Sequence, residues 1–175
     1  SNAVEIMTAE YEVKIVDSKV IYVDVFGDDE TGDGSQDNPY ASLSRAFEDI
    51  NAVNTTIYIM PGVYSGELNY DKEIDIPSGA SVEIIGLSEF GDNVIFKDLS
   101  NRFLGFTNNA GGFTYDAGFA VKNIVFRDST FDDGFITAQS VSVLLDNISF
   151  INATPRKLAV GGDMGFELTV SNVER

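Results

Sequence analysis

The chain has 175 residues, of which 43% are apolar and 11% aromatic, so it is long and apolar enough to bury one core. Its 28 acidic and 11 basic residues give a formal charge of −17, which argues against binding to nucleic acid or to an anionic membrane surface. Cys, His and Trp are absent, so disulfides, Ser-His-Asp triads and the usual zinc sites are excluded within this chain. No apolar run approaches membrane-spanning length, and we expect no direct membrane insertion in this fragment.

The N-terminal third divides into an entry and a cap. Residues 1–3 are typical of the scar of a cleaved expression tag, and residues 4–19 are expected to form an extended or hairpin entry. Residues 20–54 are expected to form a cap that includes a helix over about 42–50. Apolar residues follow helical spacing there and Ser42 is a suitable N-cap; the spaced residues are Leu43, Ala46, Phe47 and Ile50. We expect this helix to cover the strand edges at one end of the molecule.

The remaining residues, 55–175, are rich in short β-forming stretches. The first three lie at 56–59, 74–76 and 82–85 and are separated by Pro-Gly and Ser-Gly turns. Downstream, an Asn-Ile/Val-x-Phe pattern recurs three times, and Asn172-Val173 begins it again. The asparagines stand at intervals of 30, 24 and 25 residues: Asn93, Asn123, Asn147 and Asn172. Two further patterns recur with it. One occurs at 135–137 and again at 158–160, and the other at 143–145 and again at 168–170.

A repeat with three distinct β stretches predicts parallel stacking of each strand on its counterpart in the next repeat. Alternation then points Val94, Phe96, Ile124, Phe126, Ile148 and Phe150 inward, and the asparagines form a ladder at one turn. From this pattern we predict an all-β, right-handed parallel β-helix (a solenoid) with one N-terminal capping α-helix. The chain ends in mid-repeat, so we also expect it to be a C-terminally truncated piece of a longer repeat protein.

The order of motifs in residues 20–175 resembles a known superfamily. Ile21-Tyr22-Val23-Asp24, Gly32-Asp33-Gly34, Asn38-Pro39-Tyr40 and 57–64 resemble the opening of pectate-lyase-like right-handed parallel β-helix proteins. The stretch 147–153 is similar to repeats of adhesin-like surface proteins of methanogenic archaea. The resemblance implies that fold and an extracellular, cell-surface location. It implies no single activity, because the superfamily holds lyases, hydrolases, esterases and inert adhesins.

Three sets of residues are candidates for a site. Asp28, Asp29 and Asp33 lie in an acidic loop that invites a calcium site, although Tyr40 stands where an EF-hand needs Glu. The alternative is an acidic turn beside the helix.

The second set is Lys97 and Arg127, which would point outward on neighbouring repeats near Asp98 and Asp128. On this fold, polysaccharide lyases combine acidic calcium ligands with a basic residue that abstracts a proton. The alternative is a solvated face of interleaved charges, with the two aspartates in a turn ladder.

The third set is Phe106, Phe113 and Tyr115, in a Gly-rich segment that lengthens one repeat. Aromatic faces on such a loop suit sugar rings, and the alternative is that they pack back on the core.

These observations favour a non-catalytic, adhesin-like surface module that binds glycans or a cell-surface partner or acts as a rigid stalk, with no cofactor. The alternative is a calcium-dependent polysaccharide lyase or another carbohydrate-active enzyme.

Overall fold

The computed structural model describes residues 18–50, 54–88, 94–108, 117–132, 134–161 and 167–174. Most of the predicted entry segment, the tag scar, Asn93, Phe113 and Tyr115 lie outside these ranges. Twelve strands are assigned in the described part: β1 (Ser18–Val23), β2 (Asn54–Ile59), β3 (Gly62–Tyr64), β4 (Lys72–Asp75), β5 (Ser81–Gly86), β6 (Val94–Lys97), β7 (Leu104–Thr107), β8 (Ala117–Arg127), β9 (Ile136–Gln139), β10 (Val141–Ile151), β11 (Ala159–Gly161) and β12 (Glu167–Glu174). One short α-helix, α1 (Leu43–Glu48), and a 3₁₀ turn (Glu67–Asn69) complete the described structure.

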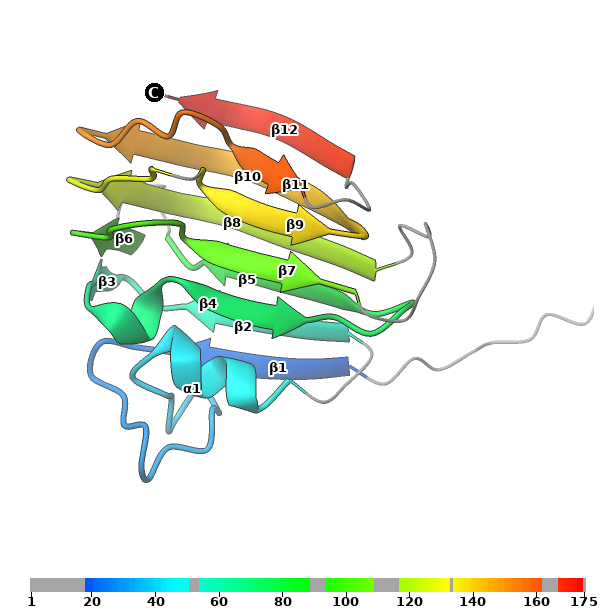
Figure 1. Ribbon diagram of the computed structural model, residues 1–175. Coiled ribbons are helices and arrows are strands. Elements are labelled where there is room, and N and C mark those ends of the chain that lie inside the picture. Colours follow the sequence, from blue (N-terminus) through cyan, green and yellow to red (C-terminus); the bar gives the residue numbers. More distant parts are fainter. Residues whose placement is uncertain are drawn as a thin grey trace, which may run out of the picture.

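The strands form two parallel sheets that face each other across the core (Figure 1). The larger has eight strands, with the order β1-β2-β5-β8-β10-β12 and with β3 and β6 paired beside this path. The smaller has the order β4-β7-β9-β11. The β stretches that recur in the sequence therefore pair with the same stretch of the next repeat, as Val143 does with Leu168 and Ile136 with Ala159.

The predicted β-helix is wrong, because the described strands form two separate parallel sheets rather than coils of three separate strands. The prediction failed at the asparagines, which we expected to separate strands. We expected the stretches before and after Asn147 to be two strands divided by a turn, but both belong to the single strand β10, and β8 runs through Asn123 in the same way.

Each of these asparagines bends its strand without ending it. Asn123 and Asn147 have φ of 59° and 52°, in the left-handed region that Asn tolerates better than most residues. Side chains at 143 and 145 point into the core before the bend, and those at 148 and 150 do so after it. The predicted ladder is confirmed for this pair, since Asn147 Nδ2 donates to Asn123 Oδ1 at 3.1 Å.

The predicted inward positions are confirmed, and they build a column of stacked rings. Tyr64, Phe96, Phe126 and Phe150 stack on one another with centroids 5.2–5.8 Å apart. Phe103 and Phe135 stand beside the column and meet Phe126 edge-on at 4.8 and 4.7 Å. Ring pairs of both kinds contribute beyond simple area burial, so this column adds to the stability that burial alone gives the core.

Helix α1 begins where the sequence predicts and lies at the β1 end of the molecule (Figure 1). Ser42 is the N-cap, and its Oγ accepts from the Arg45 amide at 3.2 Å. Leu43 and Ala46 are buried against the core. No helix in the described ranges is long and apolar enough to cross a membrane.

Candidate functional site

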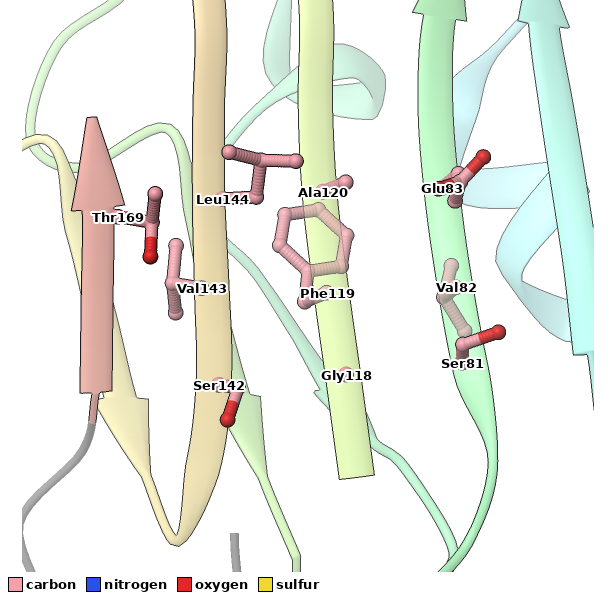
Figure 2. Close-up of a pocket in the computed structure, with 10 residues that line it drawn as sticks. All are labelled: Ser81, Val82, Glu83, Gly118, Phe119, Ala120, Ser142, Val143, Leu144 and Thr169. Atoms are coloured by element: carbon pink, nitrogen blue, oxygen red, sulfur yellow. The ribbon is translucent and has the colours of Figure 1, made fainter. Parts of the chain in front are cut away.

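The outer face of the eight-stranded sheet carries a shallow groove (Figure 2). Its floor is Gly118 and Ala120, the two outward-facing positions at the start of β8. One wall is the outward face of β5 and the other that of β10 and β12; the wall residues are Ser81, Glu83, Ser142, Leu144 and Thr169. The register places them in two rows across the strands, Ser81-Gly118-Ser142 and Glu83-Ala120-Leu144-Thr169.

The groove exists because the first two outward positions of β8, Gly118 and Ala120, carry almost no side chain. A Cβ added at Gly118 would meet only Ser81 Cβ, at 3.7 Å, an ordinary contact distance. On the next strand the larger side chain of Leu144 forms one wall, and the space between it and the small residues of β8 is a hollow of about 230 Å³. That is smaller than a typical drug-sized pocket and suits a ligand that is only partly enclosed.

The four-stranded sheet offers an instructive contrast at Gly105. There the guanidinium of Arg102 fills the space over the glycine. Arg102 Nη1 donates to Thr137 Oγ1 at 2.6 Å, Nη2 lies 2.7 Å from Glu73 Oε2, and Nε donates to Asp71 Oδ1 at 2.8 Å. A glycine on an outer face is thus covered by protein in one sheet and left open in the other.

The rim of the groove is polar, whereas its floor and the Leu144 wall are apolar. Glu83 Oε1 accepts from Lys122 Nζ at 2.9 Å, so the ammonium is already paired. Ser81 Oγ donates to Asn54 Oδ1 at 2.7 Å, and Ser142 Oγ lies 3.4 Å from Glu167 Oε2. An apolar floor with hydroxyl, amide and carboxylate groups at its edge matches a ligand that has both apolar C–H faces and hydroxyl groups.

Lys97 and Arg127 are brought together, as the sequence predicts, because β6 and β8 pair at these residues. Lys97 Nζ lies 3.3 Å from Asp98 Oδ2. Asp98 and Asp128 have positive φ, and Asp128 Oδ1 accepts from Asn152 Nδ2 at 2.7 Å. The aspartates therefore occupy a turn ladder, which is the alternative that the sequence left open. Arg127 Nε is buried and has no partner among the described residues.

The acidic loop uses its carboxylates to hold its own backbone and the helix cap. Asp29 accepts from the Ala41 and Ser42 amides and from Ser42 Oγ, at 2.7–3.0 Å. Hydrogen bonds from the backbone amides of Thr31, first, and Glu30 lower the pKa of Asp28. Hydrogen bonds from Ser35 lower the pKa of Asp33. In the described ranges, no three acidic side chains gather closely enough to hold a metal ion.

Phe106 lies in the core, fully buried and stacked on Phe119 with ring centroids 3.4 Å apart. Its ring presents no face to a ligand, so this member of the predicted aromatic set packs inward. Sequence reasoning missed the groove itself. The available signal was the alternation in β8 of small residues, Gly118 and Ala120, with large ones, Phe119 and Val121.

Comparison with known proteins adds no identification: no family model, curated protein or solved structure matches this chain.

Proposed function

We propose that this chain is a non-catalytic glycan-binding module of an extracellular surface protein and that it holds sugar in the groove on the outer face of the eight-stranded sheet. The observation that carries the proposal is the open hollow over Gly118 and Ala120. A sugar ring has an apolar C–H face for the floor and hydroxyl groups for the rim, and such a shape and polarity fit this groove.

The framework around the groove suits binding without large rearrangement. The strands that form its floor and walls are joined by parallel ladders, with ten paired positions between β8 and β10. A site on rigid strands is preformed, so little conformational entropy is lost when a ligand binds. Because the groove is shallow and encloses only part of a ligand, we expect micromolar or weaker affinity.

The test is to fill the hollow. Gly118→Leu places a side chain over the floor, and the backbone tolerates it because the new Cβ meets nothing closer than 3.7 Å. Ser149→Leu adds similar bulk on β10 outside the groove and is the matched control. Retention on immobilised glucan, mannan, galactan and polygalacturonate is measured for all three proteins, with circular dichroism and urea unfolding to confirm folding.

We expect the parent and Ser149→Leu to be retained on at least one polysaccharide and Gly118→Leu to be lost from it. Equal retention of Gly118→Leu would place binding elsewhere and refute the groove as the site. Release of unsaturated or reducing-end product, abolished by Lys97→Ala with Arg127→Ala, would show an enzyme and overturn the proposal.

A further inference from the structure

A pair of tyrosines lies on the same outer face as the groove, on the strands nearest the helix. Tyr22 of β1 and Tyr58 of β2 are paired in register, and their ring centroids are 5.4 Å apart with a tilt of 37°. Both side chains point away from the core, since the residues that flank them, Ile21, Val23, Ile57 and Ile59, are fully buried. Each tyrosine is half-buried, so part of each ring faces outward.

The register connects this aromatic pair to the groove. Tyr58 is paired with Ile85 on β5, and Ile85 with Lys122 on β8. This row runs beside the row Glu83-Ala120-Leu144, two residues away along the strands. With a strand spacing of about 4.8 Å and a rise of about 3.3 Å per residue, Tyr58 lies roughly 12 Å from the groove floor at Ala120.

The surface between the two features is partly apolar. Ile85 is half-buried on this face, directly between Tyr58 and the Lys122–Glu83 ion pair. A ligand that leaves the groove toward β1 therefore passes the Lys122–Glu83 ion pair and then the aliphatic side chain of Ile85 before it reaches the rings. Tyrosine is well suited to such a position because its face is apolar and its hydroxyl group is polar.

The charge of the protein restricts the ligand. The chain carries a formal charge of −17, and the one lysine on this connecting surface is paired with Glu83. A polyuronate brings one carboxylate with each sugar and would be repelled, whereas a neutral glycan meets no such penalty.

From these observations we infer that the outer face binds an extended neutral polysaccharide chain, which runs across the strands from the groove to a second subsite at Tyr22 and Tyr58. This inference rests on the proposed function. It adds a ligand class, a direction and two residues that take part in binding.

The inference predicts that affinity depends on chain length and that the tyrosines contribute only to long ligands. The probes are the tri- and hexasaccharides of linear β-1,4-glucan, β-1,4-mannan and β-1,4-galactan, with oligogalacturonides of the same lengths, measured by calorimetry on the whole chain. The variants are Gly118→Leu, Tyr22→Ala with Tyr58→Ala, and Tyr22→Phe with Tyr58→Phe. The Phe variant keeps the ring faces and is the matched control.

We expect a neutral hexasaccharide to bind at least tenfold more tightly than its trisaccharide. The double Ala variant should lose that advantage and bind the trisaccharide within twofold of the parent, and the double Phe variant should keep it. Gly118→Leu should lose both ligands.

Equal affinity for the two lengths, or an unchanged hexasaccharide affinity in the double Ala variant, would refute the second subsite while the proposed function stands. Tighter binding of the oligogalacturonides would refute the ligand class. Absence of binding to every probe would overturn the proposed function together with this inference.

Discussion

Truncation of Phe126 is expected to be among the most damaging single changes in this protein. Its side chain is fully buried and meets five other phenylalanine rings, with centroids 4.7–6.1 Å away. Burial and the cavity left behind make Phe→Ala cost about 3–5 kcal/mol in general, and several lost ring pairs place this site at the upper end. We therefore expect Phe126→Ala to lower the free energy of unfolding by about 4–5 kcal/mol.

The assay is equilibrium unfolding in urea followed by far-ultraviolet circular dichroism. Phe126→Leu keeps most of the volume and should cost about 1–2 kcal/mol. Phe26→Ala is the matched control because that side chain is 93% exposed, and it should stay within about 0.5 kcal/mol of the parent. A loss below about 2 kcal/mol for Phe126→Ala, at an unchanged urea slope, would refute the reasoning that the aromatic column dominates the core.

Three further predictions concern turns, the cap and pH. Asn147→Ala should lower the unfolding free energy by about 1–2 kcal/mol and Asn147→Gly by clearly less, because only the glycine accepts a φ of 52° without strain; urea unfolding compares them. Asp29→Ala should lower the free energy of unfolding by about 2 kcal/mol, because the Ser42 amide and hydroxyl lose their acceptor. Asp29→Asn keeps an acceptor oxygen and should lose less; an equal loss in urea unfolding would show that the charge of Asp29, and not its hydrogen bonds, stabilises the cap. The hydrogen bond from Lys19 is the main cause that lowers the pKa of Asp49, so the ionised Asp49 stabilises the fold above the ordinary Asp pKa of about 4 and this contribution is lost as pH falls through the lowered pKa. Between pH 7 and 2, the urea midpoint of Asp49→Asn should therefore fall less steeply than that of the parent. Parallel curves for the two proteins would contradict this.

The local elements could be predicted because their signals are local. The β stretches, the α1 cap and the inward positions follow from alternation and from residue types at known spacing. The Asn-Ile-x-Phe repeat also gave the parallel register correctly, since Ile148 pairs with Ile124 and Phe150 with Phe126. These features depend on the period of the sequence, which the chain shows directly.

The division into sheets could not be predicted, because it depends on whether Asn147 ends a strand or bends it. An asparagine with positive φ can either end a strand or bend it. The strand continues through Asn147 because β10 keeps its pairing with β8 on both sides of that residue. The groove could not be predicted because its depth depends on neighbours in other strands. Gly105 and Gly118 both occupy outer faces, yet Arg102 covers only the first.

The bends at the asparagines determine which changes in chain length the protein can accept. Asn123 and Asn147 lie opposite each other, and Asn172 takes the corresponding place on β12 with a φ of 50°. Deletion of one of them would shift half of its strand by one residue against neighbours that keep the bend, and its inward side chains would then point outward. A residue gained between the strands, by contrast, only enlarges a loop. Natural variation in length should therefore be found in the connections, while the strands that cross the bend keep a constant length.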